Sequence, residues 1–258
     1  MDAVVTAGGI PKPEDALYPY TQGKLKALVD VAGKPMIQWV LDALGASKTV
    51  DQVVIVGLDS DSVIECSKPM IFLDNHGGML DNVRAGIDKI SAINPQAELV
   101  LMVSSDIPAV TAEIVDWTVE SALESEHDLY YNLITRQVME SRYPGSNRSF
   151  IRMKDADVCG ADMNVIRCSA AAGNDELWAN LIAARKNVFK QAALVGYGTL
   201  FLLLTRQLSL EAAVRRGSHG LGLRGRAILC PHPEIGMDVD KPYQLEILRH
   251  DLGANAAA

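Results

Sequence analysis

The chain has 258 residues, of which 48% are hydrophobic and 22% charged, enough for one large α/β domain or two small ones. A net charge of −8 argues against a broad nucleic-acid-binding surface, which is normally basic, but not against a nucleotide site served by a few lysines. The four cysteines have neither CxxC nor zinc-type spacing, which predicts reduced thiols and a cytoplasmic protein. The start of the chain does not resemble a signal peptide, and residues 200–204 form the longest apolar run, so no membrane partner is expected.

The first half of the chain alternates between short apolar runs and helical patterns. Buried strands are predicted over residues 2–6, 52–57, 70–73, 99–103 and 128–134. Apolar spacing predicts helices from Pro35, as the first helical residue, to about Gly45, over 79–93, and after a Thr111 cap. The proline-containing segment 10–23 is predicted to be a loop. This order predicts an α/β fold, a Rossmann-like three-layer α/β/α arrangement with a mostly parallel central sheet.

The second half has a less regular pattern. Strands are predicted over 149–153, 163–167 and 227–230, and a last helix from Pro242 to about His250. Residues 174–216 have an almost wholly helical pattern, in which 200–204 predict a buried helix. We therefore expect a single domain over 1–252, with 174–216 as a helical elaboration and 253–258 as a frayed tail. The elaboration could pack on the sheet or make a homo-oligomer.

A glycine pair and two lysines lie near the end of the first predicted strand. Ligands of open α/β sheets bind at the carboxyl ends of strands, and Gly8 and Gly9 would let backbone amides approach an anion there. The pair fits neither the dinucleotide nor the Walker fingerprint, and an ordinary strand-ending turn is the alternative. Lys24 and Lys26 could reach phosphates held at this turn, or could be solvated surface lysines.

Three aspartates are placed where a metal would be needed. Asp106 closely follows the predicted strand 99–103, where it could hold Mg²⁺ or simply make a turn. Asp238 and Asp240 are two residues apart, so in an extended segment both would face one site. Asp240 could also cap the helix that begins at Pro242.

Six segments in chain order resemble the MobA-like nucleotidyltransferases, a family with a glycosyltransferase-A-type, Rossmann-like fold. They are TAGG (6–9), KALVDVAGKPMIQWVLDAL (26–44), GGMLDNVRAGI (77–87), SSDIPAVT (104–111), FIRMKDADVCGADMNVI (150–166) and MDVDKPYQLE (237–246). The resemblance covers the whole chain, and its second and last segments are the most specific.

The resemblance implies a role for individual residues. Backbone amides of Ala7, Gly8 and Gly9 would hold a nucleoside triphosphate, and Lys26 would contact the phosphate under attack. Asp106 would be catalytic through the Mg²⁺ that it binds, with Asp240 completing the metal shell. The residues implied to frame the base or ribose are Gly78, Asn82 and Arg84. The residues implied to meet the acceptor are Asp162 and Asn164.

The chain departs from the family pattern in two places. Many members have an arginine four residues past the second glycine, where this chain has Pro13, so Lys12 or Lys24 would have to clamp the triphosphate. Gly160-Ala161 replaces a usual pair of glycines near the acceptor.

The leading hypothesis is a Mg²⁺-dependent transfer of a nucleoside monophosphate from the triphosphate to a small phosphorylated acceptor, with release of pyrophosphate. The alternatives are glycosyl transfer from a nucleotide sugar and a catalytically silent nucleotide-binding module.

Overall fold

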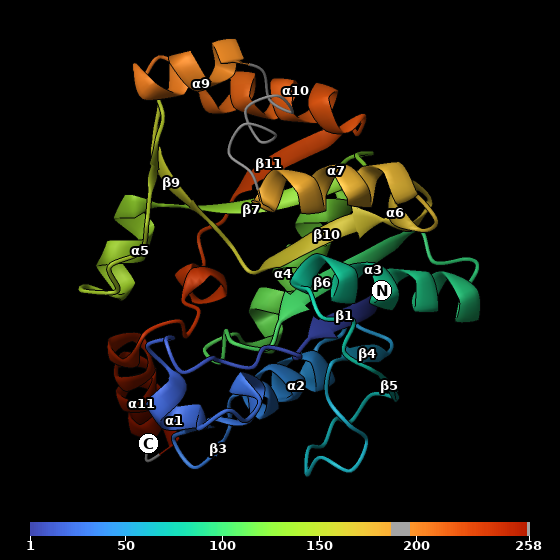
Figure 1. The fold of residues 1–258 in the computed structure, drawn as a ribbon, viewed down its shortest axis with the longest axis vertical. Helices are drawn as coiled ribbons and strands as arrows, with labels where there is room; N and C mark the ends of the chain where they lie inside the picture. The colour runs from blue at the N-terminus through green and yellow to red at the C-terminus, as the bar shows by residue number, and fades with distance from the viewer. Residues whose placement is uncertain (187–196, 257–258) are drawn as a thin grey trace.

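A computed structural model describes residues 1–186 and 197–256 and is built around one large sheet (Figure 1). Within those residues the sheet has nine strands in the order β5-β4-β1-β6-β10-β7-β9-β8, and β11 pairs with β7. The strand bounds are β1 Asp2–Thr6, β4 Val53–Val56, β5 Met70–Leu73, β6 Leu99–Ser104, β7 Leu129–Thr135, β8 Ile151–Arg152, β9 Asp157–Gly160, β10 Met163–Arg167 and β11 Gly225–Leu229.

Most of these strands point the same way. The pairs β1–β4, β1–β6, β4–β5 and β7–β11 are parallel, and β10 is antiparallel to both of its neighbours, β6 and β7. Because β10 runs backwards, its first residue lies beside the carboxyl end of β6, with Met163 paired to Val103. The residues just before β10 therefore share a sheet edge with the residues just after β1 and β6.

Helices cover both faces of the sheet. Apolar side chains of α3 (Met79–Ile93), α6 (Cys168–Ala171) and α7 (Asp175–Lys186) pack on one face, against Val4, Val54 and Val100. Those of α2 (Met36–Ala46) and α4 (Ala112–Leu123) pack on the other, against Val5, Ile55 and Leu101. Side chains alternate between the two faces of a strand, so strands buried on both faces need continuous apolar runs. The predicted three-layer α/β/α fold with a mostly parallel sheet is confirmed.

The predicted elements of the first half are confirmed to within about two residues, with three differences in the connections. The predicted loop 10–23 contains a short helix, α1 (Tyr18–Thr21). Pro35 is the N-cap of α2 rather than its first residue, because it also ends a hairpin of β2 (Asp30–Val31) and β3 (Lys34–Pro35). No sequence pattern indicated α5 (Arg136–Arg142), which follows β7 directly and has Thr135 as its N-cap.

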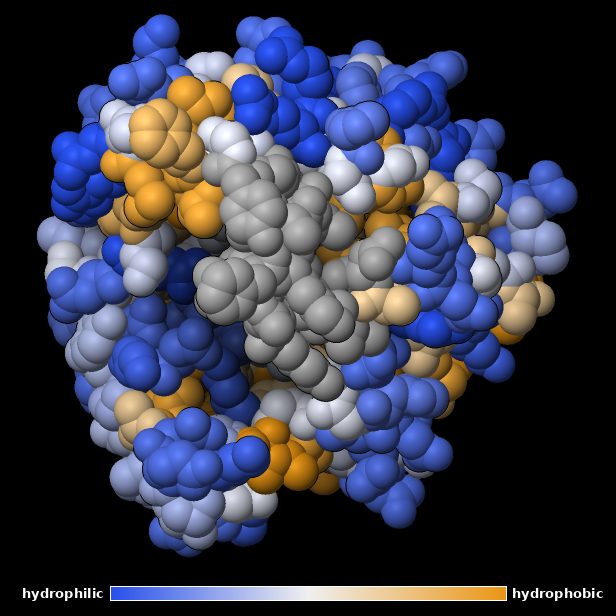
Figure 2. Space-filling model, turned by 45° about the horizontal axis from the view of Figure 1, so that its top comes forward, coloured by the Kyte–Doolittle hydropathy of each residue, from blue (hydrophilic) through white to orange (hydrophobic). Residues whose placement is uncertain are grey.

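The helical elaboration departs from the prediction. Within the described residues, α7 is followed by α9 (Tyr197–Leu204) and α10 (Leu210–Leu221), with a break between the last two; residues 187–196 lie outside the described part. The predicted buried helix is wrong for α9, since Phe201 is 65% and Leu204 75% exposed. Hydrophobic residues are visible in Figure 2 at the upper left, where α9 lies in Figure 1. Because α9 packs at the periphery of the molecule, part of its surface stays exposed although its residues are apolar.

A short 3₁₀ turn and a 15-residue helix close the structure at the C-terminal end. A 3₁₀ turn, η2 (Pro233–Gly236), precedes the acidic segment 237–240, and α11 (Pro242–Ala256) follows it. The predicted helix end at His250 is wrong, because α11 continues to Ala256. A second 3₁₀ turn, η1 (Lys26–Leu28), lies between α1 and β2. None of the described helices combines the length and apolar character required of a membrane span.

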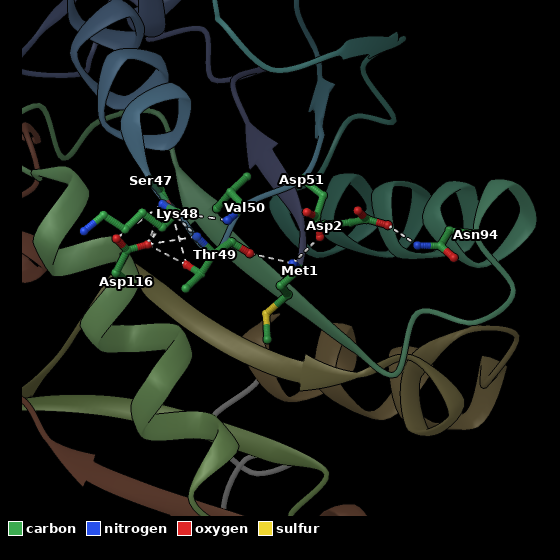
Figure 3. A network of polar contacts seen from close by, with 9 residues as sticks. All are labelled: Met1, Asp2, Ser47, Lys48, Thr49, Val50, Asp51, Asn94 and Asp116. Atoms are coloured by element: carbon green, nitrogen blue, oxygen red, sulfur yellow. Dashed lines mark hydrogen bonds and ion pairs between the residues drawn. The ribbon is translucent and has the colours of Figure 1, made fainter.

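A polar network ties the strands at the edge where β1 begins (Figure 3). The Asp116 carboxylate of α4 accepts hydrogen bonds from the Ser47 hydroxyl at 2.6 Å, the Thr49 hydroxyl at 2.7 Å and the Lys48 amide at 3.0 Å. It thereby fixes the segment that joins α2 to β4. This network is structural and lies at the edge opposite to the carboxyl ends of the parallel strands.

Candidate active site

Five segments of the chain meet at the carboxyl edge of the sheet through backbone hydrogen bonds. The Lys26 amide donates to the Gly9 carbonyl at 2.8 Å, and the Ser105 amide donates to the Thr6 carbonyl at 3.1 Å. The Val239 amide donates to the Asp106 carbonyl at 3.0 Å, and the Ser104 amide to the Asp162 carbonyl at 2.9 Å. These bonds fix the lysine and the aspartates to one sheet edge. Figure 2 shows a hollow with hydrophilic walls on the side to which β1 and β6 run in Figure 1.

Lys26 is the central cation of this edge. Its Nζ lies 2.6 Å from Asp106 Oδ2 and 2.7 Å from Asp240 Oδ1. The Lys26 and Asp106 side chains are each 16% exposed, whereas Asp240 is 59% exposed and faces the opening. The structure therefore brings together the three residues that sequence analysis assigned to catalysis and metal binding.

Asp238 completes a group of three carboxylates. One oxygen each of Asp106, Asp238 and Asp240 lies within 4.8 Å of the others. Asp238 and Asp240 therefore lie close together, as their spacing predicts, and their role toward a metal ion stays a prediction. The alternative cap role does not occupy the Asp240 carboxylate, because the Gln244 Oε1 accepts from the amides of Asp240 and Lys241 at the start of α11.

Asp162 lies beside this group and is the residue directly before β10. Its side chain is 37% exposed, and its Oδ2 lies 3.7 Å from the Arg148 Nη2. Burial and the negative charge of Asp106 raise the pKa of Asp162 to about 7, against the opposing effect of Arg148. Burial is the largest of these causes, and the charges of the neighbouring carboxylates add to it.

The ion pairs of Lys26 with Asp106 and Asp240 shift the pKa values of Lys26 and Asp240. Burial acts to lower the pKa of Lys26, but Asp106 and Asp240 outweigh it and raise the pKa. Burial acts to raise the pKa of Asp240, but Lys26 outweighs it and lowers the pKa. Lys26 is therefore a fixed positive charge at neutral pH, as a residue that contacts phosphates needs to be.

The Gly8-Gly9 turn is held by two residues that the sequence analysis did not single out. Gly57 has a φ of +93°, and a Cβ there would lie 2.4 Å from the Gly8 Cα. The Asn75 Nδ2 donates to the Gly8 carbonyl at 2.8 Å, and its Oδ1 accepts from the Gly77 amide at 2.9 Å. Asn75 thus joins the glycine turn to the start of α3. A Cβ on Gly9 would meet no atom within 4 Å, so one side of the turn is open.

The predicted base or ribose residues occupy different environments. Gly78 is the N-cap of α3, and Asn82 is buried against Asn75, to whose Oδ1 its Nδ2 donates at 3.2 Å. Arg84 forms ion pairs with Asp88 of α3 and Asp175 of α7. The structure therefore links Gly78 and Asn82 to the glycine turn, whereas the guanidinium of Arg84 joins two helices.

The two predicted acceptor residues also differ. Asp162 lies beside the group of three carboxylates, near Arg148. Asn164 lies inside the sheet, where its Oδ1 accepts from the Asn132 amide at 2.8 Å and its Nδ2 donates to the Ala161 carbonyl at 2.8 Å. Both ends of the Asn164 amide are thus bound to backbone, and its role toward an acceptor stays a prediction.

Sequence reasoning missed Arg148, whose side chain is 16% exposed and forms an ion pair with Asp238. Arg148 lies in the loop between α5 and β8, outside every segment that carried the resemblance, so no motif signalled it. For Asn75 the sequence offered only a weak indication of a role at the site, namely its position between β5 and Gly77-Gly78. Gly57 had a clearer one, because a glycine directly after a buried strand is a frequent site of positive φ.

The chain is similar in sequence and fold to known proteins. A family model described as the MobA-like NTP transferase domain matches residues 19–142. A hypothetical transferase from Thermus thermophilus has 30% identity and a TM-score of 0.79, with 95% of this chain and 98% of that chain covered. No curated protein matches the chain.

Two more distant structures share the fold. One is CMP:2-keto-3-deoxy-manno-octonic acid synthetase complexed with CTP, with 16% identity, a TM-score of 0.57 and 98% of each chain covered. The other is 2-C-methyl-D-erythritol 4-phosphate cytidylyltransferase from Thermus thermophilus, with 13% identity, a TM-score of 0.53 and coverages of 99% and 98%. With a family match over the first half and a 30%-identical relative over nearly the whole length, this chain belongs to the MobA-like NTP transferases, a family of nucleotidyltransferase enzymes.

Proposed function

We propose that this protein transfers a nucleoside monophosphate from a nucleoside triphosphate to a small phosphorylated acceptor and releases pyrophosphate, with Mg²⁺. The observation that carries the proposal is the Lys26 ammonium, shared between Asp106 and Asp240 beside the Gly8-Gly9 turn. A fixed cation next to an open glycine turn suits phosphates, and the carboxylates suit a hard divalent cation.

In this reaction an oxygen of the acceptor phosphate attacks the α-phosphorus of the nucleotide. A new P–O bond forms there while the bond to the bridging oxygen breaks, and the electron pair leaves with pyrophosphate. The backbone amides of Ala7, Gly8 and Gly9 would hold the triphosphate, and Lys26 would stabilise negative charge on the phosphorus under attack. Little covalent chemistry falls to the protein, so positioning and charge account for the rate.

The carboxylate group fits a divalent cation. Asp106 Oδ1 is buried and has no hydrogen-bond partner among the described residues, so one lone-pair site is free. Asp106 and Asp240, with Asp238 beside them, would supply the oxygen ligands that Mg²⁺ prefers. When bound, the ion would neutralise charge on the phosphates and orient them.

The acceptor would approach from the side of β10. Asp162 lies there, and Arg148 lies beside it. CTP, which accompanies the synthetase named above, is one nucleotide to test, because the two proteins share a fold.

The test measures pyrophosphate release from each of the four nucleoside triphosphates with a set of sugar and alditol phosphates, with Mg²⁺ and with a chelator. Wild-type protein should release pyrophosphate with at least one pair, and Asp106→Asn should abolish most of that rate. Asp61→Asn is a matched control, since Asp61 is an exposed loop residue. Equal rates for wild type and Asp106→Asn would refute the assignment of the site.

The alternatives give different results in the same screen. Cleavage of a nucleotide sugar without pyrophosphate would favour glycosyl transfer. Tight nucleotide binding without turnover, across all acceptors, would favour a silent binding module.

A further inference from the structure

A second cation lies in the carboxylate group of the candidate site. Arg148 forms an ion pair through Nη1 with Asp238, its Nη2 lies 3.7 Å from Asp162 Oδ2, and Nη2 donates to the Gly160 carbonyl at 3.4 Å. Asp238 is 10% exposed and Arg148 16% exposed, so this pair is largely removed from water. Arg148 thus neutralises one of the three carboxylates that are placed to hold a divalent cation.

The charges of the site do not balance. The carboxylates are those of Asp106, Asp162, Asp238 and Asp240, and the cations among the described residues in contact with them are Lys26 and Arg148. With all four aspartates ionised, four negative charges face two positive ones. The difference equals the charge of one divalent cation. Asp106 Oδ1 and Asp162 Oδ2 are among the buried carboxylate oxygens that have no hydrogen-bond partner within the described residues, as expected from this deficit.

We propose that Arg148 is the counter-ion of Asp238 until a divalent cation binds, and that the cation takes the place of Arg148 on this carboxylate. Arg148 is then a positioning residue that sets how tightly the site holds metal before the nucleotide arrives. The proposal rests on the cation site of the proposed function. It goes further by assigning Asp238 as a ligand and Arg148 as its competitor.

The competition follows from the chemistry of the two groups. A guanidinium stays protonated at all pH values that a protein meets, so Arg148 cannot relieve repulsion from a metal ion by losing its proton. When a metal ion binds, Arg148 has to give up its contact with Asp238, or its positive charge weakens the binding of the ion. In a partly desolvated site such a charge acts strongly over a few ångströms.

The experiment measures binding of Mn²⁺ and Mg²⁺ alone to the full chain without nucleotide, by calorimetry and by the electron paramagnetic resonance signal of free Mn²⁺. Arg148→Gln should bind the metal roughly tenfold more tightly than wild type, because a competing charge is gone. Arg148→Lys, which keeps the charge, should bind less tightly than Arg148→Gln. Arg152→Gln removes the same charge from an exposed site on β8 and should leave metal affinity unchanged.

A double-mutant comparison distinguishes competition between Arg148 and the metal ion for Asp238 from a general electrostatic effect of the Arg148 charge. Asp238→Asn should weaken metal binding, and in that background Arg148→Gln should change metal affinity much less than in wild type. Unchanged or weaker binding by Arg148→Gln would overturn the proposal, as would an equal effect in both backgrounds. If the Gln variant does not fold, Arg148→Met, which fills the same buried space with an apolar chain, makes the same prediction.

Failure of this inference differs from failure of the proposed function. Pyrophosphate release with an unaltered metal affinity in Arg148→Gln would leave nucleotidyl transfer standing and remove the role of Arg148. The absence of any metal binding by wild type would remove both the competition and the metal part of the proposed function.

Discussion

At the scale of single residues, the site depends on the charge of Lys26 and on the small size of Gly57. Lys26 is the only described cation in contact with both Asp106 and Asp240. Gly57 lets the Gly8 backbone pass at a distance that no Cβ would permit. The first residue supplies charge, and the second supplies space for the turn.

Replacing Lys26 tests the charge. Lys26→Met should lower the rate of pyrophosphate release about 10²- to 10³-fold, the usual loss when one stabilising donor is removed from a developing negative charge. Lys48→Met is the control, because Lys48 is exposed at the opposite edge of the sheet. The rates are measured at saturating nucleotide. Equal activity of Lys26→Met and Lys48→Met would contradict the assignment of Lys26 to the phosphate under attack.

Replacing Gly57 tests the space. Gly57→Ala and Gly33→Ala share a left-handed backbone, with φ values of +93° and +94°, so both should lose about 1 to 3 kcal/mol of unfolding free energy. Only the Gly57 Cβ would meet Gly8, since nothing lies within 4 Å of a Cβ on Gly33. Gly57→Ala should therefore be the less stable variant in urea and should also bind nucleotide more weakly. Equal stabilities would show that Gly8 gives way easily.

At the scale of elements, α4 is joined to the end of α2 through Asp116 (Figure 3). Burial acts to raise the pKa of Asp116, but hydrogen bonds from Ser47, Thr49 and the amides of Lys48 and Thr49 outweigh it and lower the pKa. The ionised carboxylate is therefore the form that the fold stabilises. Without it, the connection to β4 would lose its common acceptor.

Asp116→Ala should lower the free energy of unfolding by about 2 kcal/mol, the typical contribution of hydrogen bonds to a charged group. Glu120→Ala controls for helix propensity and charge, because Glu120 is exposed one turn further along α4. Both variants are measured by urea unfolding at pH 7. A loss no larger than that of Glu120→Ala would mean that solvent replaces the network at little cost.

The lowered pKa of Asp116 also predicts how the stability difference between wild type and Asp116→Ala depends on pH. A carboxyl group whose pKa is lowered by folding contributes stability above its unfolded pKa, and this contribution is lost as the pH falls through the folded value. The stability difference between wild type and Asp116→Ala should thus be constant from pH 7 to about 5 and shrink below about 4, near the unfolded pKa of aspartate. A difference that grew on acidification would contradict the lowered pKa.

At the scale of the whole molecule, a net charge of −8 opposes binding of an anionic nucleotide. Binding therefore depends on local cations and on a metal ion that offsets the acidic group at the sheet edge. The five segments of the site come from both halves of the chain, so a ligand held there should stabilise the molecule as one unit.

A thermal-shift screen tests this expectation. A nucleotide at one hundred times its dissociation constant adds about 2.7 kcal/mol to the folded state, or about 5 to 10 °C in melting temperature for a chain of this size. The shift should require Mg²⁺, should be largest for the true substrate base and should be strongly reduced in Asp106→Asn. Equal shifts for all nucleotides in the presence of a chelator would argue against a metal-assisted site.

The layers of the fold follow from the sequence pattern, and most residues of the candidate site could be named from the sequence. Continuous apolar runs such as residues 2–6 and 99–103 can be buried only between two helical layers. The resemblance to the family implied the roles of Lys26, Asp106 and Asp240, and the structure places their side chains in contact. The tertiary structure alone decided that Arg148 reaches Asp238 and that α9 lies exposed. It also decided that Arg84 joins α3 to α7. Such contacts depend on where loops and peripheral helices come to rest, and a pattern of local spacing carries no information on partners that are distant in the chain.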